Sequence, residues 1–306
     1  MPEAISSGPP VDAIKNRVTV FAGAEKGCGK TAAFRAMALK VQGRGPVALF
    51  TIGFGASNTA PQERGKAAHP TPDAAAEPPT VRVGQGDIVI TTVPLARAAE
   101  ARLEVMDALP GRSAIGPLCV CRAVRGGGVT LVGPETFGQL ASTIEFVRRE
   151  GLAESVLVDG AAGRLTQAGA LPDAQIAYCA KADGSNHLRV AENIELISRL
   201  ADLPLEEDIE HGKQGCLCLE GPLTASVMDG LGKDITHVSI GSFSDCFLDA
   251  PSFGRAARRI MITVRRRIPL LCFAVALKDI KPQAFLAAAP SAAGRAVFDL
   301  YGDAPR

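Results

Sequence analysis

The chain has 306 residues, with 33 Lys and Arg against 32 Asp and Glu, and 47% of its residues are hydrophobic. This length is ample for one large α/β domain with its own core. The balanced charge lacks the basic surplus that non-specific nucleic-acid binding needs, and the absence of Trp argues against a base-stacking platform. We therefore expect no nucleic-acid partner.

Neither a targeting leader nor a membrane span is expected. The first residues include Glu3 and Asp12 and show no basic start followed by an apolar run. The longest apolar segment, Ile268–Leu277, is shorter than the roughly 18 to 20 residues that cross a bilayer. The eight cysteines are interpreted as free thiols. These features predict a cytoplasmic protein without membrane contact.

Strand and helix patterns alternate in chain order. Short runs rich in apolar residues predict strands, and apolar residues at helical spacing predict helices. The expected strands are Arg17–Ala22, Pro46–Ile52, Asp87–Thr92, Pro117–Ala123, Gly128–Val132, Ser155–Asp159, Ala174–Cys179, Cys216–Leu219, Thr236–Ile240 and Pro269–Ala276. The expected helices are Lys30–Gln42, Leu95–Leu109, Glu135–Glu150 and Leu188–Leu200.

This order predicts a doubly wound, mostly parallel α/β sheet in a single domain, residues 1–306. The glycines of Arg125–Gly128 predict a β-hairpin extension with positive φ angles at its turn. The segment Gly55–Thr80 has almost no large apolar residue and is interpreted as a mobile insert. It is either a tolerated surface insertion or a lid or docking loop.

The sharpest motif lies between the first expected strand and helix. The segment ends in Gly27-Cys28-Gly29-Lys30-Thr31 and predicts a phosphate-binding loop of the P-loop NTPase type. Its backbone N–H groups and the helix N-terminus would cradle phosphates, Lys30 would reach the β and γ phosphates, and Thr31 would bind Mg²⁺. The motif expects a glycine where Ala24 stands. The expected nucleotide-binding residues are Gly23, Ala24, Glu25, Lys26, Gly27, Cys28, Gly29, Lys30, Thr31 and Ala32.

A second Mg²⁺ ligand is expected at the carboxyl end of a neighbouring strand. Asp159 closes the run Ser155–Asp159 and is the best candidate, although a turn or helix-capping role is the alternative. Asp87 fits less well, because it opens its strand. Thr91 and Thr92 end that strand and would hydrogen-bond phosphate or a magnesium-bound water.

Two more residues are candidates for catalysis. Arg164 follows Asp159 by five residues and would contact the γ phosphate or a partner, with an ordinary solvated arginine as the alternative. Glu135 would orient the attacking water, but an acidic residue in the first turn of a helix is favoured by the helix dipole alone.

Two Cys-x-Cys pairs have spacing that permits metal chelation. Cys119 and Cys121, like Cys216 and Cys218, share a face when they lie on a strand. Both pairs sit in apolar runs without a histidine at zinc-finger spacing. They are interpreted as small buried hydrophobic residues.

The order of these motifs resembles the P-loop ATPase subunit of the reactivase for lysine 5,6-aminomutase and related aminomutases. The matching segments are Gly27–Thr31, Gly86–Thr92, Gly133-Pro134, Asp159–Ala161 with Arg164, Gly241–Leu248 and Val297–Leu300. The family usually has a Gly-Ala segment where this chain has Tyr178–Asp183.

The resemblance implies an ATP-binding, Mg²⁺-dependent ATPase that reactivates an adenosylcobalamin-dependent aminomutase by promoting exchange of damaged cofactor. The implied partners are a second reactivase subunit and the aminomutase itself, and an oligomer is compatible with it. Two alternatives stay open on the same scaffold. One is a small-molecule kinase or ATP-dependent ligase, and the other is a nucleotide-binding regulatory module without turnover.

Overall fold

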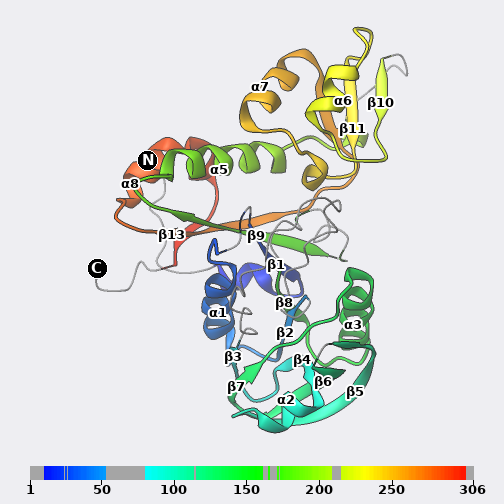
Figure 1. The fold of residues 1–306 in the computed structure, drawn as a ribbon, viewed down its shortest axis with the longest axis vertical. Helices are drawn as coiled ribbons and strands as arrows, with labels where there is room; N and C mark the ends of the chain where they lie inside the picture. The colour runs from blue at the N-terminus through cyan, green and yellow to red at the C-terminus, as the bar shows by residue number, and fades with distance from the viewer. Residues whose placement is uncertain are drawn as a thin grey trace, which may run out of the picture. The chain divides into compact units, whose positions relative to one another are not determined.

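The computed structural model describes residues 10–23, 25, 27–52, 80–113, 115–160, 165, 171, 173–208 and 215–300. Contacts divide the chain into two units, residues 1–40 with 162–306 and residues 41–161. Each unit contains helices and strands (Figure 1), and the strands are parallel in the first unit and both parallel and antiparallel in the second. The α/β class predicted from the sequence is therefore confirmed.

The first unit contains two parallel sheets. Its larger sheet has the strand order β14-β13-β9-β1, and a smaller sheet has the order β10-β11-β12. The strands are β1 (Val18–Ala22), β9 (Ala174–Ala182), β10 (Cys216–Cys218), β11 (His237–Ile240), β12 (Met261–Val264), β13 (Leu270–Leu277) and β14 (Val297–Asp299). The α-helices are α1 (Lys30–Val41), α5 (His187–Ala201), α6 (Ala225–Gly230), α7 (Ala250–Arg259) and α8 (Pro282–Ala288). The short 3₁₀ turns are η1 (Val11–Ile14), η2 (Glu206–Asp208), η3 (Phe243–Asp245) and η4 (Pro290–Gly294).

Helices cover both faces of the larger sheet of the first unit, α5 and α8 on one face and α1 on the other (Figure 1). All five residues of β1 are buried, as a strand covered on both faces requires. Phe21 of β1 packs edge to face against Phe34 of α1, with ring centroids 5.7 Å apart. This contact fixes the helix that follows the predicted phosphate loop.

The second unit has a five-stranded sheet of order β8-β2-β4-β6-β5 and a separate antiparallel pair, β3 and β7. Strands β8, β2 and β4 are parallel, whereas β6 runs antiparallel to both β4 and β5. The elements are β2 (Val47–Thr51), β3 (Thr80–Val83), β4 (Ile88–Thr92), α2 (Val93–Ala98), β5 (Arg102–Ser113), β6 (Gly116–Arg125), β7 (Gly127–Thr130), α3 (Phe137–Arg149) and β8 (Ser155–Asp159).

The helix predicted over Leu95–Leu109 is correct only for its first four residues. Helix α2 ends at Ala98, and the residues from Arg102 onward form β5, a long edge strand that pairs with β6. Most residues of β5 are exposed, and Val105 keeps 51% of its surface accessible. Such a strand lacks the apolar alternation that distinguishes strands in sequence, and its Leu, Glu, Met and Ala residues favour a helix intrinsically.

The prediction of a hairpin at Arg125–Gly128 is also wrong, because the two strands that flank this turn do not pair with each other. Strand β6 pairs with β5, and β7 pairs with β3. Among these glycines none has a positive φ. A Cβ at Gly127 would lie 2.6 Å from the backbone nitrogen of Ala101, and one at Gly126 would lie 2.8 Å from the Val83 carbonyl oxygen. These glycines therefore permit close approach of neighbouring backbone.

Among the described residues, no helix is long and apolar enough to cross a membrane. The predicted insert Gly55–Thr80 lies outside the described residues except for Thr80, which begins β3.

Candidate functional site

The predicted phosphate loop lies between β1 and α1, the order that the motif requires. Gly27 and Gly29 have φ angles of +78° and +93°, where residues with a side chain are strained. Helix α1 begins at Lys30, and the Ala33 N–H donates the first helical hydrogen bond to the Gly29 carbonyl at 2.9 Å. The glycines thus permit a sharp loop directly before a helix.

Lys30 is folded back into this loop. Its side chain is buried, with 9% of the residue exposed. The ammonium donates hydrogen bonds to the Glu25 carbonyl oxygen at 2.8 Å and to the Cys28 sulfur at 3.3 Å. A buried ammonium is costly without such partners, so the loop and Lys30 support each other. Thr31 and Ala32 follow in the first turn of α1 and are half-buried.

The loop is packed closely against the rest of the first unit. A Cβ at Gly23 would collide with the carbonyl oxygen of Cys179 and with the sulfur of Cys28. A Cβ at Gly29 would lie 2.9 Å from a methyl group of Leu300. The loop is therefore held between β9 and the residue that follows β14.

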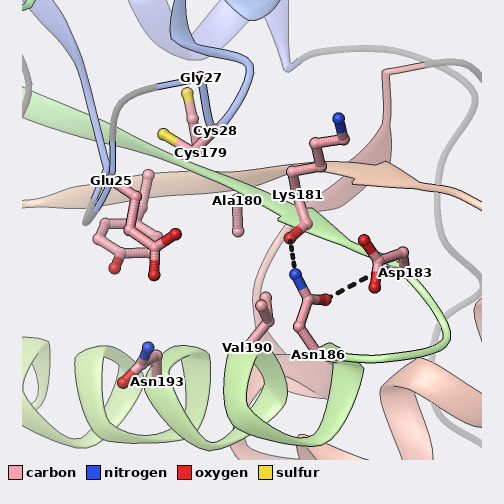
Figure 2. A pocket seen from close by; sticks show the side chains of 11 residues that line it. Glu25, Gly27, Cys28, Cys179, Ala180, Lys181, Asp183, Asn186, Val190 and Asn193 are labelled. Carbon is pink, nitrogen blue, oxygen red and sulfur yellow. Dashed lines mark hydrogen bonds between the residues drawn. The ribbon is translucent and has the colours of Figure 1, made fainter.

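A cavity of about 320 Å³ opens beside the loop (Figure 2). The loop contributes one wall, and the carboxyl end of β9 with the start of α5 contributes the others. The lining residues are Glu25, Gly27, Cys28, Tyr178, Cys179, Ala180, Lys181, Asp183, Asn186, Val190 and Asn193. Strand β9 is parallel to β1, so this is the strand edge at which ligands bind in open α/β sheets. Its volume is that of a small-molecule site.

The polar groups of the cavity are held by local hydrogen bonds. The Asp183 carboxylate accepts from the Ser185 hydroxyl at 2.6 Å and from the Ser185 backbone N–H at 2.9 Å. These hydrogen bonds, the hydroxyl first, lower the pKa of Asp183 below its ordinary value. The Asn186 side chain accepts from the Asp183 N–H and donates to the Lys181 carbonyl (Figure 2). An ionised carboxylate and a fixed amide therefore face the cavity.

An ion pair joins the loop to α5. Glu25 Oε1 lies 2.6 Å from Arg189 Nη1, and both side chains are 57% exposed. The hydrogen bond that Arg189 donates to Glu25, followed by the negative charge of Glu25, raises the pKa of Arg189. The acidic residue of the loop is thereby neutralised beside the N-terminus of α1.

Asp159 is placed in the second unit. It ends β8 as predicted and is buried, with 6% of the residue exposed. Its carbonyl oxygen accepts a hydrogen bond of 3.3 Å from the Thr51 hydroxyl at the end of β2. The hydroxyl of Thr92, at the end of β4, is buried without a hydrogen-bond partner among the described residues. The carboxyl ends of these three parallel strands thus form a polar edge.

Asp87 has a structural role in the same unit. Its carboxylate accepts from the Gly84 N–H at 2.7 Å and from the Val47 N–H at 3.2 Å. It directly precedes β4, at the strand end where the sequence placed it, and closes the turn between β3 and β4. Burial raises the pKa of Asp87, and the two backbone hydrogen bonds oppose that shift.

The remaining predicted residues are Glu135, Ala24, Lys26 and Arg164. Glu135 is exposed and precedes Thr136, which caps α3 by accepting a hydrogen bond from the Gln139 N–H. Ala24, Lys26 and Arg164 lie outside the described residues. The roles proposed for Asp159, Arg164 and Glu135 stay predictions from the sequence.

Sequence reasoning missed Lys181, Asp183 and Asn186, which line the cavity. The available signal was the largely polar run Lys181–Asn186, which begins at the end of a buried strand. The expectation that both Cys-x-Cys pairs are buried is correct for Cys119 and Cys121 only, because Cys218 is exposed and Cys216 half-buried.

Comparison with protein-family models, with curated proteins and with solved structures found no match for this chain.

Proposed function

We propose that the chain binds ATP with Mg²⁺ at the loop between β1 and α1 and hydrolyses it to act on a partner protein. The observation that carries the proposal is the position of Lys30. This residue begins α1, and its buried ammonium donates a hydrogen bond to the carbonyl oxygen of Glu25 in the loop. A phosphate-binding lysine has this position, at the first residue of the helix and directed into the loop.

The electrostatics of the helix start support an anionic ligand. The first N–H groups of a helix have no partner within the helix and carry partial positive charge. The first turn of α1 contains no acidic residue. Arg189 neutralises Glu25, the acidic residue of the loop among those described. A triphosphate thus meets net positive charge from Lys30 and the helix N-terminus.

The adjoining cavity supports a ligand larger than phosphate. Loop residues Gly27 and Cys28 line it together with Asp183 and Asn186, which offer a carboxylate acceptor and an amide. Ribose hydroxyls and exocyclic amines of a purine are the groups that such side chains recognise. We assign the phosphates to the loop and the nucleoside to the cavity.

Lys30 and Thr31 would then have separate roles. Lys30 would neutralise charge that develops on the transferred phosphoryl group, and the Thr31 hydroxyl would bind Mg²⁺. The sequence adds Asp159 as a second Mg²⁺ ligand, Arg164 as a γ-phosphate contact and Glu135 as the residue that orients water. Binding of ATP shifts a conformational equilibrium only if the nucleotide binds its two states with different affinity.

The partner follows from the family resemblance. We propose that ATP turnover drives release of damaged corrinoid from an adenosylcobalamin-dependent aminomutase and its replacement by fresh adenosylcobalamin. The ordered motifs from Gly27–Thr31 to Val297–Leu300 support this assignment.

The test is recovery of a cobalamin-inactivated aminomutase from the same host. The chain, the second reactivase subunit, ATP, Mg²⁺ and adenosylcobalamin are added, and aminomutase activity and ADP are measured together. Wild type and Lys40→Ala, a change at the exposed far end of α1, should restore activity, whereas Lys30→Ala should not. ADP release that needs a small-molecule acceptor and no partner would instead identify a kinase or ligase. Binding without turnover would identify a regulatory module.

A further inference from the structure

The small sheet of the first unit has one polar face. Cys216 and Cys218 of β10 lie opposite His237 and Ser239 of β11, and Ser239 lies opposite Thr263 of β12. Because alternate residues of a strand share a face, these five side chains lie on the same face.

The other face of the sheet is apolar. Val238, Ile240, Ile262 and Val264 are buried in the main hydrophobic cluster, and Leu217 packs against it. Parallel strands usually read as continuous apolar runs because both faces are covered. Here the second face instead carries sulfur, imidazole and hydroxyl groups, which points to a ligand of matching chemistry.

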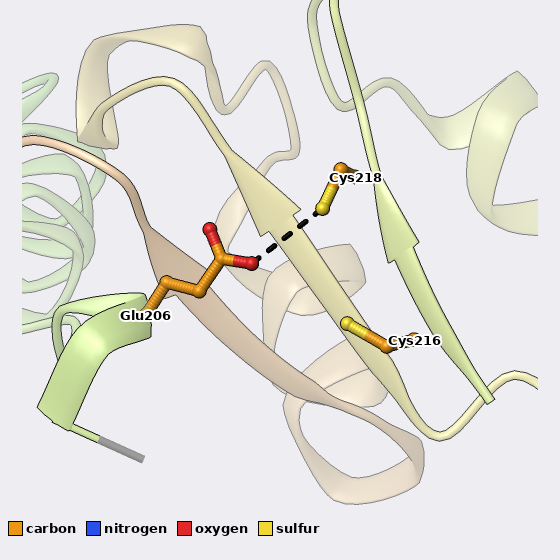
Figure 3. A group of neighbouring side chains, drawn as sticks. All are labelled: Glu206, Cys216 and Cys218. Atoms are coloured by element: carbon orange, nitrogen blue, oxygen red, sulfur yellow. Dashed lines mark hydrogen bonds between the residues drawn. The ribbon is translucent and has the colours of Figure 1, made fainter. Parts of the chain in front are cut away.

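Glu206, from the short turn η2, reaches over this polar face (Figure 3). A carboxylate oxygen of Glu206 and the sulfur atoms of Cys216 and Cys218 all lie within 4.8 Å of one another. The Cys218 thiol is 3.5 Å from Glu206 Oε1. In the part of the chain that the structure describes, this is the one group of three such side chains with ligand atoms at that spacing.

We infer that Glu206, Cys216 and Cys218 form a zinc site. Thiolate sulfur and carboxylate oxygen are Zn²⁺ ligands, at about 2.3 Å and about 2.0 to 2.2 Å respectively. Side chains separated by less than 5 Å need only small rotations to meet one ion at these lengths. Cys218 is exposed, so solvent reaches the site and water can complete a tetrahedral set.

Neighbouring residues support each ligand. The Ser239 hydroxyl donates to Glu206 Oε2 at 2.7 Å, which leaves Oε1 directed at the Cys218 sulfur. His237 Nδ1 lies 3.0 Å from the Cys216 sulfur, and its Nε2 lies 2.7 Å from the Thr263 hydroxyl. With the hydroxyl donating to Nε2, the Nδ1–H donates to the sulfur and stabilises the thiolate. Such partners orient metal ligands in proteins.

The other Cys-x-Cys pair provides a contrast. Cys119 and Cys121 lie on β6 with their sulfurs 3.5 Å apart, but both are fully buried. No carboxylate or imidazole joins them in a group of three among the described residues. The pair on β10 differs in having a carboxylate, a histidine and access to solvent.

The test measures Zn²⁺ affinity of the reduced, metal-free full chain by competition with a chromophoric chelator. Wild type should bind one Zn²⁺ per chain. Cys218→Ser should weaken binding by more than about 100-fold, since changes to supporting residues alone cost about 10- to 100-fold. Glu206→Gln should also weaken it, and His237→Gln should fall in the 10- to 100-fold range. The double variant Cys119→Ala, Cys121→Ala should bind as wild type.

Two further measurements separate the site from folding effects. Co²⁺ added to wild type should give the absorption of thiolate-to-cobalt charge transfer, and Cys218→Ser should lose it while keeping the circular dichroism of wild type. Zn²⁺ should raise the melting temperature of wild type and not of Cys218→Ser. Equal Zn²⁺ affinity in wild type and Cys218→Ser would overturn the inference. A wild type that binds no zinc and in which Cys216 and Cys218 form a disulfide would also overturn it.

Discussion

Arg189 of α5 lies 2.6 Å from Glu25 of the loop that follows β1, and Glu25 also lines the cavity beside this loop. Both the backbone and the side chain of Glu25 therefore make contacts at the loop. Its carbonyl oxygen accepts from the Lys30 ammonium, and its carboxylate is neutralised by Arg189. The acidic side chain beside the proposed anion site thus has its charge paired.

This relationship predicts a coupled pair of substitutions. Arg189→Gln should weaken ATP binding several-fold, because the Glu25 carboxylate would then face the phosphates without compensation. The double variant Glu25→Gln, Arg189→Gln should recover most of the lost affinity. Calorimetric titration with ATP at low and high salt measures both effects, which should shrink at high salt because the pair is exposed. Equal losses in the single and double variants would contradict the pairing argument.

Two glycines of the loop should respond differently to the same change. Gly23→Ala should abolish ATP binding, because its Cβ would collide with the Cys179 carbonyl and displace the loop. Gly27→Ala meets nothing within 4 Å, and its φ of +78° costs about 1 to 2 kcal/mol of strain. Melting temperature and ATP affinity of both variants check this. If Gly27→Ala lost binding and Gly23→Ala kept it, the packing described for the loop would be wrong.

Asp87 should affect stability and not nucleotide binding. Asp87→Asn removes one of the two acceptors used by Gly84 and Val47, which should lower the free energy of unfolding by about 1 to 3 kcal/mol. Urea unfolding measures that loss. The exposed residue Asp107, on the edge strand β5, provides the control variant Asp107→Asn, which should unfold nearly as wild type.

The same variant has a defined pH dependence. Burial raises the pKa of Asp87 above its ordinary value of 3.8. The pKa of Asp87 is therefore higher in the folded state than in the unfolded state. Its contribution to the free energy of unfolding is complete below the unfolded-state pKa and is lost as pH rises through the folded-state pKa. The stability difference between wild type and Asp87→Asn should therefore decrease as pH rises from about 4. A difference that grows with pH would show that the backbone hydrogen bonds outweigh burial.

The sequence predicted the buried elements best. Strands β1, β2, β4 and β8 have every residue buried, so their continuous apolar runs were visible without neighbours. Strands β3, β5, β12 and β14 were missed, because β5 is an exposed edge and the others have only three or four residues. Each of these strands forms by pairing with another strand, and that pairing leaves no pattern in its own few or exposed residues.

The candidate site was predicted in part. Gly27, Gly29 and Lys30 were found because backbone conformation and helix position restrict which residues can stand there. Asp183 and Arg189 were missed because β9 and α5 bring them to the loop from more than a hundred residues away. For Cys218 the apolar context suggested burial, but β10 is an edge strand and leaves the thiol exposed.

The central claim is that the loop around Lys30 binds a nucleoside triphosphate, and calorimetric titration of the full chain with ATP and Mg²⁺ tests it most directly. Lys30→Ala removes charge-assisted hydrogen bonds of about 1.5 to 3 kcal/mol, so its affinity should fall about 10- to 100-fold below that of wild type. Lys40→Ala, at the exposed end of the same helix, should bind as wild type does. Wild type that binds neither ATP nor GTP, or Lys30→Ala that binds ATP as tightly as wild type, would contradict the claim.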